Sequence, residues 1–244
     1  MRIPRFYHAD TLQPASETAL TGGVFHHAIR VLRLQPGDRL ILFDGSGREF
    51  TAQIQAVSRQ SARVQLDGGH IGQCESPLAV HLWQGVSRGE RMDYALQKAV
   101  ELGVASITPV LAERSQHHRR GERLEKRLHH WQGVIIAACE QCGRTVLPEL
   151  SPTRPLLEHL ESPPTGQRLL LDPAADHGLR EQPPPTDAAL TLLIGPEGGL
   201  SEVEIRAAHA VGFTGVRLGS RILRTETATA TALAAIQTLW GDLG

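Results

Sequence analysis

Two apolar segments near the C-terminal end of the chain each lead into a glycine-containing turn, and this repeated pattern constrains the fold more than any other feature. The first segment, residues 188–194, ends at Gly195-Pro196, where strand pairing must stop. The second, residues 216–218, ends at Gly219. Each turn precedes a sequence that can start a helix, so we expect two strand–turn–helix units. Two such turns side by side would form a ligand cleft.

Both helices carry signals at their first residues. Ser201 followed by Glu204 predicts a capping box, in which the serine hydroxyl and the glutamate carboxylate each accept a free backbone N–H. For the second helix we expect Thr225 or Thr227 as the cap and an end near Trp240. That helix has Ala, Thr or Leu on almost every face, so we expect it to be buried between its own domain and a second subunit.

The first turn can admit a flat ligand close to the backbone. Its glycines, Gly195, Gly198 and Gly199, carry no side chain that would keep a planar group away. The alternative is that both turns are only connections within an α/β sheet. The sequence has neither a G-x-x-x-x-G-K-[ST] phosphate loop nor a G-x-G-x-x-G motif after a strand, which argues against a nucleoside triphosphate or a Rossmann dinucleotide.

The character of the chain changes near residues 67–77, which predicts two domains, 1–72 and 73–244. In the first, short alternating segments separated by glycine-rich turns predict a small antiparallel barrel with strands at 39–43, 49–57 and 62–66. In the second, strands alternate with helices, which predicts a parallel sheet flanked by helices. Its expected elements are strands at 81–86, 106–110 and 168–172, helices at 92–102 and 122–142, and loops at 151–166 and 181–187.

Composition narrows the class of protein. The chain has 244 residues and a formal net charge of −1, so its overall charge does not indicate a nucleic-acid partner. No apolar run approaches the length of a membrane span, the first five residues lack the apolar core of a signal peptide, and three cysteines form no disulfide pattern. We therefore expect a cytoplasmic enzyme without membrane contact.

Positive charge is concentrated in residues 114–127. This segment could bind RNA phosphates, or it could be a solvated helix face with ion pairs between successive turns. Phosphate contacts would give affinity and salt dependence without base choice.

The chain resembles the SPOUT superfamily and, within it, the bacterial 16S rRNA uridine-N3 methyltransferases. The resemblance rests on G-P-E-G-G-[LF]-S-x-x-E from Gly195 and L-G-x-R-I-L-R-x-E-T-A from Leu218. Further matches lie at residues 5–7, 26–27, 31–38, 97–104 and 140–144. Arg88 is a departure, since the family is expected to have lysine there more often.

The resemblance implies a PUA-like β-barrel followed by a SPOUT domain, an α/β fold with a C-terminal trefoil knot. It also implies a homodimer that holds S-adenosylmethionine in the knot and methylates N3 of a uridine in 16S rRNA, within the assembled small subunit. The residues then expected to bind the cofactor are Leu171, Ile194, Gly195, Pro196, Gly198, Gly199, Leu218, Gly219, Ile222, Leu223 and Thr225. The residues expected to bind RNA are Arg5, Arg33, Arg88, Arg114, Arg119, Arg120 and Arg123.

Methylation of uridine N3 requires that an imide lose its proton. The site therefore needs a base, or a positive charge that stabilises the forming anion. Arg224 and Arg144 are the candidates for that charge, because arginine stays protonated. Glu197 and Glu226 are candidate bases, although Glu226 could instead stabilise a helix N-terminus.

Two other patterns carry less weight. Cys139-x-x-Cys142 has redox spacing but follows a long helix, where a redox motif would open one. The histidine doublets, at 26–27, 117–118 and 129–130, point apart and lack metal-ligand spacing, so we expect no metal. Two alternatives to the expected enzyme stay open: a non-catalytic RNA-binding protein with a vestigial pocket, and a SPOUT methyltransferase that acts on another RNA or base atom.

Overall fold

The computed structural model describes residues 3–115 and 122–244, and for residues 122 and 123 it describes the backbone alone. The chain divides into two compact units. Unit 1 comprises Met1–Glu75 and Cys139–Leu147, and unit 2 comprises Ser76–Ala138 and Pro148–Gly244. The first division thus lies close to the boundary expected after residue 72. Unit 1 also includes a later segment, 139–147, which the sequence pattern placed in the second domain.

Unit 1 is built on a single β-sheet. Its strands, in spatial order, are β1 (Arg5–Tyr7), β3 (Arg39–Phe43), β4 (Arg48–Val57), β5 (Ala62–Leu66) and β2 (Glu17–Leu20), and β6 (His70–Ile71) pairs with β4. The strands expected at 39–43 and 62–66 are confirmed, and the expected strand at 49–57 begins one residue earlier. The sheet is antiparallel except at one edge, where β1 runs parallel to β3.

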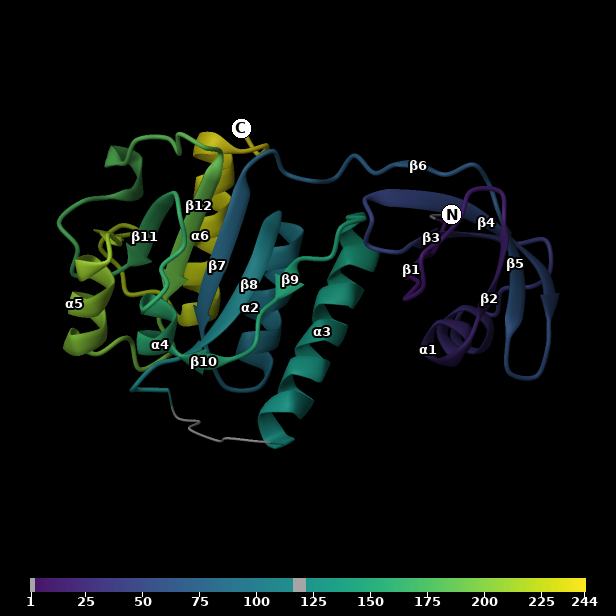
Figure 1. The fold of residues 1–244 in the computed structure, drawn as a ribbon, viewed down its shortest axis with the longest axis horizontal. Helices are drawn as coiled ribbons and strands as arrows, with labels where there is room; N and C mark the ends of the chain where they lie inside the picture. Colours follow the sequence, from purple (N-terminus) through teal and green to yellow (C-terminus); the bar gives the residue numbers. More distant parts are fainter. Residues whose placement is uncertain (1–2, 116–121) are drawn as a thin grey trace. The chain divides into compact units, whose positions relative to one another are not determined.

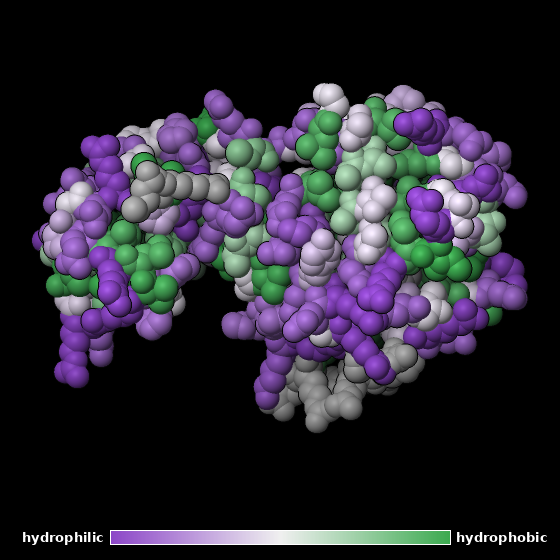
Figure 2. All heavy atoms as spheres, turned by 180° about the vertical axis from the view of Figure 1, so that it is seen from behind, coloured by the Kyte–Doolittle hydropathy of each residue, from purple (hydrophilic) through white to green (hydrophobic). Residues whose placement is uncertain are grey.

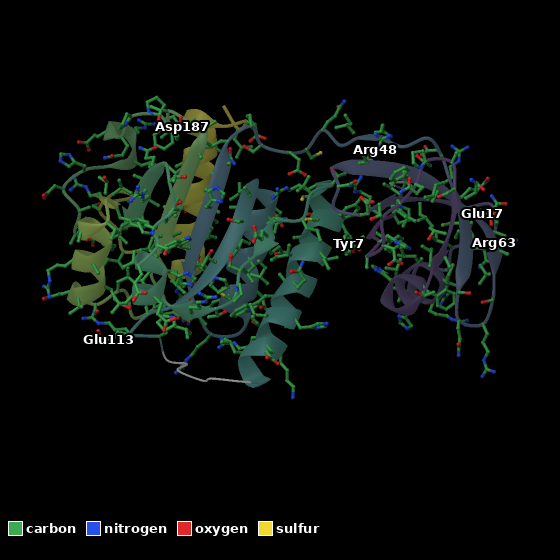
Figure 3. The ribbon with its side chains drawn as sticks, in the orientation of Figure 1. Tyr7, Glu17, Arg48, Arg63, Glu113 and Asp187 are labelled. Carbon is green, nitrogen blue, oxygen red and sulfur yellow. The ribbon has the colours of Figure 1, made fainter. Side chains whose placement is uncertain are left out.

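Alternating side chains of this sheet form the core of unit 1. Leu40 and Leu42 on β3 face the same core as Phe50, Ala52 and Ile54 on β4. The opposite face is polar, and there Glu17 Oε2 and Arg63 Nε lie 3.8 Å apart as an exposed ion pair between β2 and β5 (Figure 3). This half-buried pattern is what the alternation in the sequence predicted.

A short helical segment also contributes to unit 1. Helix α1 (Gly22–Phe25) continues directly into η1 (His26–Val31), a π-helix. Phe25 and Ala28 are buried in the core, whereas Val31 and Leu32 are exposed. Arg33 follows with a φ of 58°, an uncommon value for a residue other than glycine.

Unit 2 contains a parallel sheet, as the alternation of strands and helices predicted. In spatial order its strands are β10 (Arg154–Pro155), β8 (Val104–Leu111), β7 (Ala79–Gly85), β12 (Ala189–Ile194), β11 (Gln167–Leu171) and β13 (Thr214–Val216), and β9 (Glu149–Leu150) pairs with β8. Every one of these pairings is parallel. Residues 190–194 of β12 are all buried, as expected for a strand covered on both faces.

Helices cover both faces of this sheet (Figure 1). On one face, α2 (Glu90–Glu101) packs against α6 (Thr225–Trp240). On the other, α4 (Leu156–Leu160) and α5 (Glu202–Ala210) pack together over Trp83, Leu170 and Leu193. The long helix α3 (Glu122–Cys142) has the bounds that the sequence predicted, and its last residues belong to unit 1.

Residues 151–166 were expected to form a loop, and this was wrong. They contain β10 and α4, because Leu156 and Leu160 lie one helical turn apart and both are buried in the core. The other expected loop, 181–187, is irregular except for Glu181, which ends the short 3₁₀-helix η2 (Leu179–Glu181).

Helix α6 is buried along one side only. Its buried residues are Thr225, Ala228, Thr229, Ala232, Leu233, Ile236 and Gln237. The remaining side carries no charged side chain after Glu226, and its Thr227, Thr231 and Thr238 are exposed. Figure 2 shows white and pale green residues gathered on this part of unit 2, where Thr and Ala predominate.

Candidate cofactor-binding site

The first turn of the candidate site follows β12 and ends at α5. The predicted capping box is confirmed: Glu204 N donates to Ser201 Oγ at 3.3 Å, and Ser201 N donates to Glu204 Oε2 at 2.8 Å. The other oxygen, Glu204 Oε1, accepts the backbone N–H of Glu113 at 2.8 Å. Glu204 therefore also fixes the segment after β8 to this turn, a role that no local sequence signal showed.

The second turn lies between β13 and α6. The expectation that Thr225 or Thr227 caps α6 was wrong, because the N-cap residue is Arg224 and no side chain caps this helix end. Thr225 Oγ1 instead donates to the carbonyl oxygen of Gly195 at 2.9 Å. The expectation that the two turns lie side by side is thus confirmed.

A buried polar network supports this junction. Gln84 Nε2, at the end of β7, donates to Thr225 Oγ1 at 3.2 Å, and Thr229 Oγ1 donates to Gln84 Oε1 at 2.7 Å. Gln84 and Thr229 are fully buried. Because each polar group in the network has a partner, it can hold both turns without an unpaired buried group.

The two turns enclose a cavity of ≈ 480 Å³ at the carboxyl ends of β11, β12 and β13. In parallel α/β sheets this edge is the usual position of a ligand site. Every residue expected to bind the cofactor lines this cavity except Gly198. An added Cβ at Gly198 would lie 2.9 Å from the carbonyl oxygen of Arg114, so this glycine is needed for close packing of the backbone.

The cavity wall also includes charged residues to which the sequence analysis gave no role. They are Arg91, Asp172 and Arg221. Arg91 lies in the first turn of α2, far from both glycine motifs in the sequence, so no motif could have identified it. The cavity therefore contains charges of both signs.

Glu197, a candidate base, lines the cavity and already accepts hydrogen bonds from other residues. Its Oε1 accepts the backbone N–H of Arg88 at 3.0 Å and Arg91 Nη1 at 3.2 Å. Burial would raise the pKa of Glu197, but the hydrogen bonds from Arg88 and Arg91 and the charge of Arg91 outweigh it and lower the pKa. A carboxylate with a lowered pKa is a weaker base.

The two candidate arginines have different surroundings. Arg224 lines the cavity and is exposed. Arg144 belongs to unit 1, where its Nε and Nη2 donate to Glu75 Oε2 at 2.9 and 2.7 Å and its side chain is only 5% exposed. Glu75 Oε1 accepts Thr145 N and Val146 N at 3.1 and 3.0 Å. The observed contacts of Arg144 are those of a structural ion pair, and its expected role at the reaction centre stays a prediction.

The residues expected to bind RNA differ in exposure. Arg33, Arg88 and Arg114 are exposed. The Arg5 side chain is only 8% exposed, donates to the carbonyl oxygens of residues 143 and 144, and pairs with Glu49. Arg119 and Arg120, and the side chain of Arg123, lie outside the described residues.

Cys139, the first residue of the pair with redox spacing, is buried in unit 1. Burial raises the pKa of the Cys139 thiol to about 12, so it stays protonated near neutral pH. This environment does not favour a reactive thiolate. Among residues 3–115 and 122–244, no group of three or more His, Cys, Asp or Glu side chains is arranged to hold a metal ion.

Comparison with known proteins places this geometry in a family. An RNA methyltransferase domain family matches residues 74–237, and an RNA methyltransferase PUA domain family matches residues 20–67. The ribosomal RNA small subunit methyltransferase E of Buchnera aphidicola (subsp. Schizaphis graminum) is 34% identical over 99% of this chain and 98% of its own length. The chain belongs to the ribosomal RNA small subunit methyltransferase E family.

Two solved structures are similar to the chain over its full length. The ribosomal RNA small subunit methyltransferase E of Neisseria gonorrhoeae, bound to S-adenosyl methionine, shares 39% identity with a TM-score of 0.93, and 100% of each chain is covered. A methyltransferase of Legionella pneumophila, in complex with bound SAM, shares 41% identity with a TM-score of 0.95, again over 100% of each chain. Within the described residues, no helix of this family member is long and apolar enough to cross a membrane.

Proposed function

We propose that this chain transfers a methyl group from S-adenosylmethionine to N3 of a uridine in 16S ribosomal RNA. The observation that carries the proposal is the cavity between the two turns, in a chain that matches a SAM-bound rRNA methyltransferase E over its full length. When bound, S-adenosylmethionine supplies an electrophilic methyl group on a sulfonium. The rest of the chemistry then depends on residues of this chain.

The lining of the cavity fits this cofactor. Leu171, Ile194 and Leu223 provide apolar surface for the adenine. Gly199 and Gly219 line the wall with positive φ values of 71° and 69°, and an added Cβ at either would have no neighbour within 4 Å, so open space adjoins the backbone there. Glu226 contributes a carboxylate suited to a cationic ligand. We propose that the ten expected residues that line the cavity bind the cofactor, and that Gly198 acts through packing of the backbone.

Deprotonation of the imide N3 leaves negative charge on the uracil ring. We propose that Arg224 stabilises this charge, because its guanidinium is permanently protonated, exposed and on the cavity wall. We also propose that Glu197 acts by orienting Arg91, since its Oε1 already accepts two hydrogen bonds. A contribution of Arg144 to the same step remains a separate prediction.

The rRNA substrate requires basic residues outside the cavity. We propose that Arg33, Arg88 and Arg114, which are exposed, contact RNA phosphates, together with the remaining arginines predicted from the sequence. For Arg5, the internal hydrogen bonds support an indirect role, in which it holds residues 143–144 in place. Because the proposed substrate is ribosomal RNA, we place the protein in the cytoplasm and its target within the assembled small subunit.

We further propose a homodimer with a knotted cofactor site. The uncharged side of α6 is suited to burial against a second copy, since its exposed threonines carry no charge. For the knot, the support is that the chain leaving β13 runs against residues 172–178. Arg217 N donates to the carbonyl oxygen of His177 at 2.9 Å before the chain reaches α6.

Two measurements test the proposed function. Calorimetric titration of the full chain with S-adenosylmethionine should give heat of binding, and its absence at high protein concentration would favour a non-catalytic RNA-binding protein. Mass mapping of methylated nucleosides in ribosomal RNA should show 3-methyluridine in the parent strain and its loss in a deletion strain. A different lost nucleoside would assign the enzyme to another RNA or base atom.

A further inference from the structure

Glu226 is an unusual member of the cavity wall. It is the second residue of α6 and lines the cavity together with Thr225 and Ala228. Its Oε2 is buried, and no described residue donates a hydrogen bond to it. A buried carboxylate oxygen without a donor is costly, so its presence at this position requires an explanation.

Its position at a helix N-terminus explains only part of this. An acidic residue in the first turn is stabilised by the helix dipole, and α5 shows how such residues are normally placed. There, Glu204 has hydrogen-bond donors at both oxygens, and Glu202 is exposed and pairs with Arg206. Glu226 differs from both because its buried oxygen has no donor.

The other charges of the cavity do not supply that donor. Arg91 is paired with Glu197 at 3.2 Å. Arg221 and Arg224 line the cavity but are exposed, and neither donates to the buried oxygen. Glu226 thus adds a carboxylate to the cavity lining, and among the described residues no donor is hydrogen-bonded to its buried oxygen.

A sulfonium matches this position chemically. It carries a full positive charge but has no N–H or O–H, so it can be attracted by a carboxylate only through electrostatics. We propose that Glu226 is the counter-charge for the sulfonium of the bound cofactor, and that it makes the cavity prefer S-adenosylmethionine over S-adenosylhomocysteine. This inference deepens the proposed function and rests on it.

The proposal has a consequence for turnover. Methyl transfer leaves the C–S bonding pair on sulfur, so the sulfonium becomes a neutral thioether and the acceptor nitrogen gains the methyl group. The attraction to Glu226 is then lost, and the spent cofactor binds less tightly than a new one. Glu226 would thus favour product exchange without contacting the RNA.

The test compares the two ligands by calorimetric titration of the full chain. For Glu226→Gln we expect S-adenosylmethionine affinity to fall about ten-fold, the effect of one nearby opposite charge, and S-adenosylhomocysteine affinity to change less than about two-fold. Glu226→Asp, which keeps the charge, should retain part of the preference. Glu202→Gln is the matched control, since it removes an exposed first-turn carboxylate of α5 and should change neither affinity.

Each other outcome is decisive. Equal losses for both ligands in Glu226→Gln would show that Glu226 only stabilises the start of α6, and would overturn the inference. An unchanged S-adenosylmethionine affinity would overturn it as well. If the wild-type chain binds neither ligand, the proposed function itself fails, which is a distinguishable result.

Discussion

The hydroxyl of Thr225 donates to the carbonyl oxygen of Gly195 at 2.9 Å, and this hydrogen bond joins the two turns that form the cavity. Gly195 follows β12 directly and Thr225 begins α6, so residues 30 positions apart in the chain meet here. The same hydroxyl accepts Gln84 Nε2 at 3.2 Å. Thr225 thus connects the first turn to the buried network around Gln84.

Thr225→Val keeps the shape of the side chain but removes both hydrogen bonds. It should lower the free energy of unfolding by about 1–3 kcal/mol, since the carbonyl of Gly195 and the amide of Gln84 would lose a buried partner. It should also weaken cofactor binding. Urea unfolding and calorimetry measure the two effects.

The matched control is Thr238→Val, which alters an exposed threonine of the same helix that bonds to Ala234. It should change the free energy of unfolding by no more than about 0.5 kcal/mol. Equal destabilisation by both substitutions would show that the junction has no special role.

Arg224→Ala separates the anion-stabilising role from cofactor binding. Loss of a donor that acts on the developing charge should lower kcat by about 10²–10³-fold, while cofactor affinity stays within about three-fold of the wild type. Single-turnover kinetics and calorimetry provide the two values. An equal loss in both would make Arg224 a cofactor ligand instead.

Glu197→Gln tests whether Glu197 is a base or an orienting residue. Because glutamine retains an oxygen that can accept from Arg88 and Arg91, we expect kcat to fall less than about ten-fold, against about 10²–10⁴-fold for loss of a general base. Arg91→Gln should have a similar effect. Combining the two changes should add little, since both disrupt the same pair.

Stability should depend on pH through His159. This residue lies on α4 with its ring centroid 5.4 Å from that of Trp83. Burial and, after it, the charge of Arg154 lower the pKa of His159 below its ordinary value of 6.5, although Glu158 opposes this shift. At a pH between the lowered pKa of His159 in the folded chain and its ordinary pKa in the unfolded chain, only the unfolded chain therefore carries the proton.

The contribution of His159 to the free energy of unfolding should consequently be complete above pH about 6.5 and be lost as the pH falls from there through the lowered pKa of the folded chain. Denaturant unfolding at a series of pH values measures this slope. In His159→Gln the free energy of unfolding should change less steeply with pH in that window, even if its value at higher pH also changes. An unchanged slope would show that other groups control the acid sensitivity.

Features that depend on neighbouring residues could be predicted from the sequence. The Ser201–Glu204 capping box, the buried strand before Gly195 and the long helix α3 all follow from local periodicity and turn chemistry. The ligand turns could be predicted for the same reason. Helix α4 was missed because its proline-rich surroundings conceal a single turn of apolar spacing.

Pairings between distant residues could not be predicted in this way. Arg144 and Glu75 are 69 positions apart, and nothing local distinguishes an arginine that will be buried in an ion pair from one that will face a ligand. The same holds for Arg5, whose burial depends on residues 143–144. Arg91 lines the cavity because of the parallel strand order of the sheet, and no sequence motif indicates this position.

The membership of residues 139–147 in unit 1 has a consequence for how this protein can be divided or recombined. Glu75 receives four N–H groups from residues 144–146, so a gene fragment that stops after Glu75 would encode an acidic residue without its counter-ion. Unit 1 is thus made of two separate chain segments and cannot be transferred as one continuous piece. A fusion or a domain swap would have to graft the end of α3 along with it.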